Sequence, residues 1–273
     1  MHSVLFIGKG VITMSLARFL TDSGWQADYY QHSSEDLKKI DISEYDFVVS
    51  CLPDAAIAKH IWRELLHCAL TWKAYNTEFI EMSTLTCEVI ADINDAFFRE
   101  NYTFTEAPFT GSKSGALSGN LIYFAYSKST PPENNVFLKS TSSKIYTFNG
   151  MSGATQFKLF YNLWGLSCLG LMGQMLPLMN SLPQKDLAVE IITSNDDFWM
   201  GAIAQQKLSQ SLSANYDDIH CKLKYTIKDI KYALDEFSDN KLDLSQRLLT
   251  LLESDRARPY YDSDFTSMYE LFR

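Results

Sequence analysis

Two residues four positions apart have side chains that suit chemistry on one small molecule. Lys158 and Asn162 lie in the stretch GATQFKLFYNLWG, whose pattern predicts a helix, and this spacing places both side chains on one helix face. Because Lys158 begins a long uncharged segment, we expect its ammonium group to be partly desolvated, which favours proton transfer near neutral pH. The alternative is a solvated lysine beside a hydrogen-bonded core amide.

A glycine pair follows the first apolar run, in LFIGKGVITMSLARFL. Gly8 permits a tight strand-to-helix turn, and Gly10 lets the backbone approach a pyrophosphate, which the N-terminus of the next helix then favours. The third glycine of a G-x-G-x-x-G pattern serves close packing of helix on strand, and Thr13 stands in its place. The loop predicts a dinucleotide site made of Gly8, Lys9, Gly10, Val11 and Ile12.

The segment after the second predicted strand bears on the choice between NAD and NADP. It reads DYYQHSSED, with no acid at the strand end to hold a ribose 2′-hydroxyl. His32 and Ser33 can donate to a 2′-phosphate, which favours NADP over NAD. The same residues also suit an ordinary surface turn.

Glycines and small hydroxyls also gather in APFTGSKSGALSGNL. Backbone N–H groups freed by glycine, together with hydroxyls, suit a carboxylate, so Thr110, Gly111 and Ser112 form a candidate substrate site. A glycine-rich turn at a sheet edge is the alternative.

Six segments, in order along nearly the whole chain, resemble the β-hydroxyacid dehydrogenase family, whose members include 3-hydroxyisobutyrate and 6-phosphogluconate dehydrogenases. The segments are Gly8-Lys9-Gly10, Cys51-Leu52-Pro53, Glu81-Met82-Ser83-Thr84, Ala107 to Leu121, Lys158 with Asn162, and Lys228-Asp229-Ile230.

The resemblance implies roles for several of these residues. Lys158 would be the general acid/base for the substrate hydroxyl, which Asn162 would orient. Lys228 would reach the cofactor and substrate cleft, although by itself it reads as a surface lysine. The further cofactor-binding residues would be Leu52, Pro53, Ser83 and Thr84.

The resemblance therefore implies an NAD(P)-dependent oxidoreductase that transfers a hydride between a nicotinamide cofactor and a small hydroxy acid or its carbonyl partner. Some relatives are imine reductases in which the lysine is replaced, whereas Lys158 is present here. The alternative is a non-catalytic binding or assembly module with a degenerate cofactor site. Its support is the set of departures from the family pattern, which includes Thr13, Ser112 and Tyr161.

Alternation of apolar runs with amphipathic stretches predicts an α/β fold with a Rossmann-like, doubly wound parallel sheet. The expected strands are Val4 to Ile7, Ala27 to Tyr30, Phe47 to Cys51, Phe79 to Met82, Phe104 to Ala107 and Leu121 to Tyr126. Helical periodicity takes over from Gly153, with breaks expected at Pro177 and Pro183. We expect a dinucleotide-binding domain over residues 1–152 and an all-helical substrate and dimerisation domain over 153–273.

Bulk properties restrict the partners. With 24 basic and 33 acidic residues the net charge is −9, so nucleic acid is not expected as a partner. The expected partner is a small-molecule carboxylate substrate. The five cysteines and five histidines have no metal-ligand spacing, so no metal site is predicted. Reduced thiols and the lack of an export signal predict a cytoplasmic protein.

One segment carries no charge over a length that could span a membrane, from Leu159 to Gln184. Its interior polar residues, such as Asn162 and Gln174, favour a buried helix over a membrane span. A helix that is apolar nearly all round must be covered, so we expect it to form the interface of a homodimer.

Overall fold

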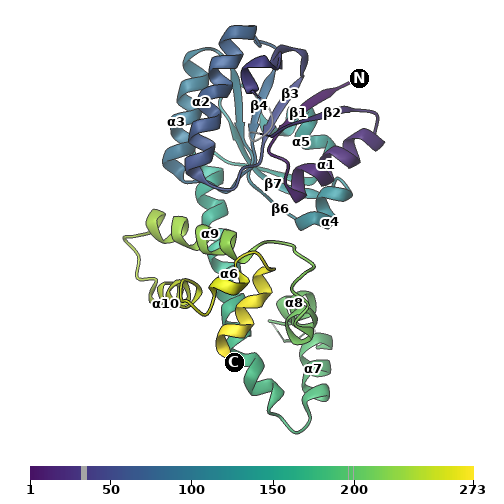
Figure 1. The fold of residues 1–273 in the computed structure, drawn as a ribbon, viewed down its shortest axis with the longest axis vertical. Coiled ribbons are helices and arrows are strands. Elements are labelled where there is room, and N and C mark those ends of the chain that lie inside the picture. Colours follow the sequence, from purple (N-terminus) through teal and green to yellow (C-terminus); the bar gives the residue numbers. More distant parts are fainter. Residues whose placement is uncertain (32–35, 196, 199) are drawn as a thin grey trace. The chain divides into compact units, whose positions relative to one another are not determined.

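A computed structural model describes residues 1–31, 36–195, 197–198 and 200–273. The chain forms two compact units, Met1–Lys158 and Leu159–Arg273. The division falls inside helix α6 (Gly153–Asn180), whereas the boundary expected from sequence lies just before this helix begins. The N-terminal unit is Rossmann-like and the C-terminal unit is helical, so the predicted fold class is confirmed (Figure 1).

Five parallel strands form the main part of the sheet in the N-terminal unit. They are β1 (Ser3–Ile7), β2 (Gln26–Tyr30), β3 (Phe47–Ser50), β4 (Glu78–Glu81) and β5 (Thr103–Glu106), in the spatial order β2-β1-β3-β4-β5. All five were expected from short apolar runs, within one or two residues at their ends.

Helices cover both faces of this sheet, as a doubly wound fold requires (Figure 1). Alternate residues of β1 point to opposite faces: Leu5 joins the core beneath α2 (Ala55–Trp72) and α3 (Cys87–Arg99), and Phe6 joins the core on the other side. The second core is completed by α1 (Val11–Asp22), α4 (Ser112–Leu117) and α5 (Val136–Ser140).

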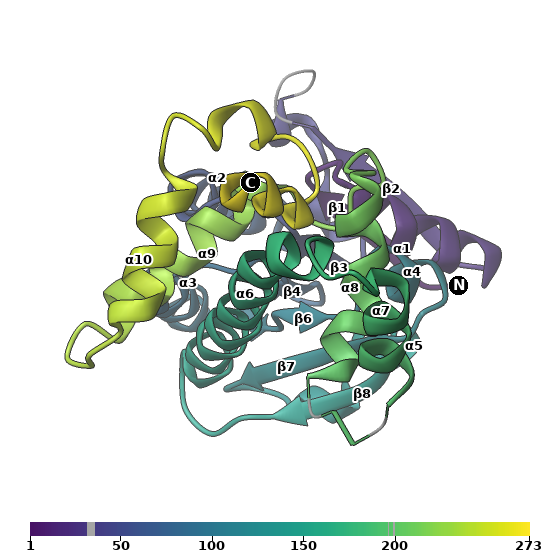
Figure 2. The same ribbon diagram turned by 90° about the horizontal axis from the view of Figure 1, so that it is seen from below.

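The far edge of the sheet departs from the parallel arrangement that the alternation predicted. β7 (Leu121–Ser127) runs antiparallel to β5 and to the two-residue strand β6 (Phe109–Thr110), and β8 (Ser142–Thr147) pairs parallel with β7 (Figure 2). The prediction was wrong here because β6 turns directly back through α4 into β7, without the long crossover that a parallel pair needs. Neither β6 nor β8 was expected.

The C-terminal unit consists of helices in the part that the structure describes. After α6 come α7 (Lys185–Ser194), α8 (Gly201–Ser213), α9 (Leu223–Glu236) and α10 (Asp243–Leu252), followed by the 3₁₀ segments η4 (Arg258–Tyr260) and η5 (Phe265–Phe272). Pro177 does not break α6, contrary to expectation. It lies in the last turn of this helix, which ends at Asn180.

The long helix α6 buries one side and exposes the other. Leu163, Leu166 and Leu176 belong to the core, whereas apolar residues on the opposite side are exposed. We call these exposed residues the α6 stripe: Trp164, Leu171, Met175 and Leu178. Among the described residues, no helix has the length and apolar character needed to cross a membrane.

Candidate functional site

The carboxyl ends of β1, β3 and β4 bring together most of the residues predicted to bind a cofactor. β2 and β3 flank β1 on opposite sides, so the chain changes direction there, which is where doubly wound folds bind ligands. Gly8 has φ +102°, and a Cβ on it would lie 2.8 Å from the Cys51 carbonyl oxygen. The loop after β1 therefore lies against the loop after β3, and only glycine fits at position 8.

Gly10 leaves open space at the start of α1. A Cβ built there meets nothing within 4 Å, and the residue is exposed. The first intrahelical bond runs from the Met14 N–H to the Gly10 carbonyl, so the amides of Val11 and Ile12 have no acceptor within α1. Open backbone, with amides that have no acceptor inside the helix that they begin, fits a pyrophosphate group.

The side chain of Thr13 ties this loop from inside. Thr13 is fully buried; its Oγ1 accepts a hydrogen bond from the Gly10 N–H at 2.9 Å and donates to the Gly8 carbonyl at 2.8 Å. A glycine at position 13 would leave the Gly10 amide without this partner. Threonine in place of the third glycine therefore does more than alter the packing of helix on strand, because its hydroxyl binds one amide of the candidate phosphate loop.

A buried carboxylate organises the ends of β3 and β4. Glu81 is fully buried and accepts hydrogen bonds from the Ser50 hydroxyl, the Trp62 indole N–H and the Ser83 amide. The Ser83 hydroxyl in turn accepts from the Leu52 amide at 2.7 Å. Burial raises the pKa of Glu81, and these three donors act against that rise. The structure thus joins Leu52 and Ser83, two predicted cofactor residues, through a shared internal network.

A second buried glutamate stands beside the first, because Glu106 on β5 pairs in register with Glu81. Its Oε2 accepts from the amide of Thr155 at 3.1 Å and from the hydroxyl of Thr155 at 2.7 Å, in the first turn of α6. Burial raises the pKa of Glu106 to about 7, against the effect of the Thr155 donors. This carboxyl group therefore titrates near neutral pH while it holds the start of α6.

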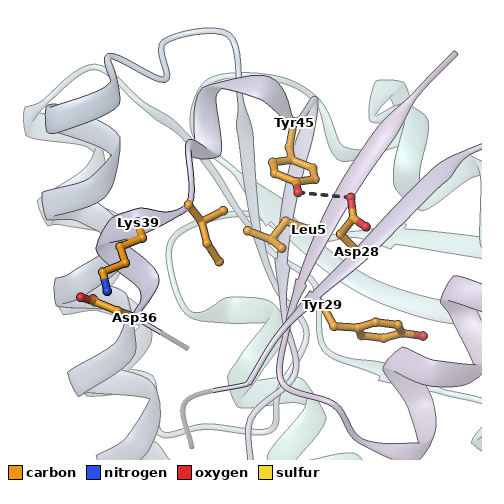
Figure 3. A pocket seen from close by; sticks show the side chains of 7 residues that line it. Leu5, Asp28, Tyr29, Asp36, Lys39 and Tyr45 are labelled. Carbon is orange, nitrogen blue, oxygen red and sulfur yellow. Dashed lines mark hydrogen bonds between the residues drawn. The ribbon is translucent and has the colours of Figure 1, made fainter. Parts of the chain in front are cut away.

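A cavity of about 490 Å³ opens beside β2, on the α2 side of the sheet (Figure 3). Asp28, the acid of β2, lines it and accepts hydrogen bonds from Tyr45 at 3.2 Å and from Gln26 at 2.8 Å. Asp28 lies two residues before the strand ends at Tyr30, so it does not replace the missing strand-end acid. His32 and Ser33, on which the NADP preference rests, lie outside the described residues.

The predicted substrate loop follows β6. Thr110 ends that strand, Gly111 has φ +130°, and Ser112 begins α4 with φ +54°. Positive φ at Ser112 is the conformation that glycine favours, and glycine is what the family pattern has there. The Ser112 hydroxyl lies 3.1 Å from the Ser114 hydroxyl.

Lys158 and Asn162 lie one turn apart on α6, as predicted. Lys158 is 8% exposed, so the fully solvated alternative is wrong for this residue. Pro53 and Thr84, the remaining cofactor residues of the prediction, are half-buried after β3 and β4.

Asn162 belongs to a polar cluster within the C-terminal unit. Its Nδ2 donates to Asp229 Oδ2 at 2.7 Å, and Lys228 Nζ lies 3.1 Å from Asp229 Oδ1. Burial lowers the pKa of Lys228, but Asp229, helped by Tyr232 and Cys221, outweighs burial and leaves that pKa raised. Lys228 is therefore a paired, largely buried cation, and the surface-lysine alternative is wrong.

Sequence reasoning left several participants of these networks unassigned, among them the Thr13 hydroxyl, Glu106 and Asp229. The last two had a detectable signal, since Glu106 is the charged last residue of a short strand and Asp229 lies beside the apolar stripe of its helix. Among the residues placed by the structure, no three of His, Cys, Asp and Glu gather as a metal site would require.

Comparisons with known proteins bear on the fold. No family model matches the chain. A cytokine-like nuclear factor, N-PAC, from Anopheles gambiae is 24% identical over 250 residues, which is 84% of this chain and 42% of that protein. The chain thus spans about two fifths of the length of this curated relative.

Solved structures match over their whole length. The Mycobacterium tuberculosis 3-hydroxyisobutyrate dehydrogenase, solved with L-serine, has a TM-score of 0.80 at 15% identity and covers 100% of this chain and 99% of its own. Psf3, solved with NADP⁺ and 2-OPP, has a TM-score of 0.81 at 19% identity over 99% of this chain and 100% of its own. An imine reductase from Streptomyces aurantiacus has a TM-score of 0.57 at 14% identity over both whole chains. The chain therefore has the dehydrogenase fold of the 3-hydroxyisobutyrate dehydrogenases, which belong to the β-hydroxyacid dehydrogenase family that its motifs resemble.

Proposed function

We propose that this chain is an NAD(P)-dependent oxidoreductase that acts on a small hydroxy acid or its carbonyl partner. The observation that carries the proposal is the loop at Gly8 and Gly10, which leaves open backbone at the carboxyl end of β1, next to amides that have no acceptor within α1. The dehydrogenase fold and the buried Lys158 support it.

A nicotinamide dinucleotide would be held at its pyrophosphate by the amides of Val11 and Ile12, next to Gly10. Leu52, Pro53, Ser83 and Thr84 would line the site beyond this loop. When bound, the cofactor supplies hydride chemistry, which no protein side chain provides. NADP is favoured over NAD, because the β2 end has no acid and Asp28 is engaged by Gln26 and Tyr45.

The chain's own groups would bind the substrate and move its proton. Thr110, Gly111 and Ser112 would hold the carboxylate, and Lys158 would take up or deliver the proton of the substrate hydroxyl. Asn162 would orient that hydroxyl. These roles follow from the family resemblance and from the burial of Lys158.

Titration of the full chain with NADPH and with NADH, followed by nicotinamide fluorescence, tests the cofactor site. Gly10→Ala is the sharpest variant, because its Cβ meets no protein atom and the Gly10 φ of −95° suits alanine. We expect this variant to retain its thermal stability and to bind the cofactor at least ~10-fold more weakly. Lys158→Ala should bind the cofactor normally and lose turnover of hydroxy acids. Failure of wild-type protein to bind either cofactor would overturn the proposal.

A second candidate is a non-catalytic module that keeps the fold. The specific observation in its favour is that the Thr13 hydroxyl accepts a hydrogen bond from the Gly10 amide, which is then not available to a phosphate. The match to N-PAC, whose name is not that of an enzyme, points the same way. This candidate predicts no turnover with any hydroxy acid, whether or not a cofactor binds.

We propose further that the chain forms a homodimer in which the α6 stripe is covered by a second copy. Trp164 and Leu178 are 65% and 62% exposed, and the stripe residues follow the 3.6-residue helical repeat. Exposed aromatic and aliphatic side chains aligned over several turns are typical of a protein interface.

A further inference from the structure

Asn162 and Asp229 meet in a contact that defines which way the Asn162 side chain faces. A carboxylate can only accept hydrogen bonds, whereas an amide has one accepting and one donating end. Asp229 Oδ2 lies 2.7 Å from Asn162 Nδ2, so the donating end is directed to the carboxylate. The carbonyl Oδ1 of Asn162 is the end of the amide that does not bind Asp229.

The carboxylate that sets this orientation is itself fixed. Asp229 is 8% exposed, and its other oxygen, Oδ1, forms an ion pair with Lys228 at 3.1 Å. Lys228 Nζ also lies over the Tyr232 ring, 5.2 Å from its centroid. As a carboxylate, Asp229 therefore presents one acceptor oxygen to the Asn162 amide and the other to the Lys228 cation.

We infer that Asp229 is a positioning residue, which turns Asn162 so that its carbonyl oxygen is the only end offered to a ligand. The site would then accept a hydrogen bond from a hydroxyl or an amine, and would not donate one to a carbonyl oxygen through Asn162. This inference rests on the proposed function for its ligand, a hydroxy acid, but its geometric part concerns Asn162 and Asp229 alone.

The isosteric variant Asp229→Asn tests the inference, because it keeps the volume and removes the obligate acceptor. With a carboxamide at 229, the Asn162 amide pairs in either orientation. We expect kcat/KM for any hydroxy acid that the wild type oxidises to fall about tenfold, with an unchanged Kd for the nicotinamide cofactor.

A double-mutant cycle separates positioning from a merely structural role. In the Asn162→Ala background, Asp229→Asn should cost less than it does in the wild type, because only the ion pair with Lys228 is then lost and no amide remains to be oriented. Ser245→Ala is the matched control, since Ser245 also links to α6, through the Ser167 hydroxyl at 3.1 Å. Its effect should be the same in both backgrounds. An undiminished loss from Asp229→Asn in the Asn162→Ala background would overturn the inference.

The orientation itself is measurable without turnover. In full-length protein with ¹⁵N-labelled asparagine, the Asn162 side-chain resonances are those that vanish in Asn162→Ser. We expect them to shift in Asp229→Asn and to stay in place in Ser245→Ala. Resonances that do not respond to Asp229→Asn would contradict the contact. A wild type that oxidises no hydroxy acid would instead refute the proposed function, and the resonances would still decide the orientation.

Discussion

At the scale of single residues, the hydroxyl of Thr13 is the most consequential departure from a dinucleotide-binding pattern. It accepts from the Gly10 amide and donates to the Gly8 carbonyl, and so closes the loop on itself. A bound phosphate would accept a hydrogen bond from the Gly10 amide if that amide were free, but in this chain the amide donates to the Thr13 hydroxyl.

Thr13→Val keeps the volume of this buried side chain and removes its hydroxyl. We expect NADPH to bind up to ~10-fold more tightly, because the Gly10 amide is released. The free energy of unfolding should fall by about 1–2 kcal/mol, since the Gly8 carbonyl loses its donor. Thr13→Ser, which keeps the hydroxyl, is the control and should bind like wild type. Fluorescence titration and chemical denaturation measure the two effects, and equal affinities for Val and Ser variants would refute this role.

The pKa of Glu106, raised to about 7 from an ordinary value of 4.5, makes stability depend on pH. A carboxyl with a raised pKa stabilises the folded chain fully below pH 4.5, and this contribution is lost as the pH rises through 7. Glu106→Gln removes this titration. Between pH 5 and pH 8 the free energy of unfolding should therefore fall less in the variant than in the wild type, and the two falls should differ by up to about 3 kcal/mol. Urea denaturation at both pH values measures this. Glu133→Gln, at an exposed glutamate, should leave the wild-type pH dependence unchanged.

At the scale of elements, α4 begins with a residue in an unfavourable conformation. Ser112 has φ +54°, which costs a residue with a Cβ about 1–2 kcal/mol. Ser112→Gly should therefore raise the free energy of unfolding by about 0.5–1 kcal/mol. Ser114→Gly removes the same Ser112–Ser114 hydroxyl contact from an ordinary helical position, and should lower it by about 1 kcal/mol. Thermal unfolding of the two variants gives the comparison, and a loss in both would contradict the strain.

The sequence predicts some of these strands and contacts and not others, for physical reasons. β1, β3, β4 and β5 were predictable because each is a mostly buried run between helical segments, and β2 was predictable from its place in the alternation. β6 was not, because two residues carry no periodicity, and β8 exposes most of its residues and has little apolar signal. The glycine loop was predictable from spacing, whereas the contact between Asn162 and Asp229 joins residues 67 positions apart and leaves no local trace.

At the scale of the whole molecule, the α6 stripe determines how copies of the chain are expected to associate. Leu171→Glu and Leu178→Glu would each place a charge in the proposed interface, where it has no partner. Each should raise the dimer Kd by at least ~30-fold, which sedimentation velocity detects as a shift to monomer. Leu244→Glu on α10, at a leucine that is 83% exposed, is the control and should leave the association unchanged. Sedimentation of the wild type as a monomer at micromolar concentration would contradict the proposed homodimer.

The first turn of α6 belongs to the N-terminal unit, because Thr155 holds the Glu106 carboxyl there. This has a consequence for synthesis on the ribosome, where the chain emerges from its N-terminus and units fold in that order. When residue 152 has emerged, all the strands that the structure describes have been made, yet Glu106 still lacks the amide and hydroxyl donors of Thr155. Completion of the nascent N-terminal unit therefore waits for the opening residues of the helix that leads into the next one.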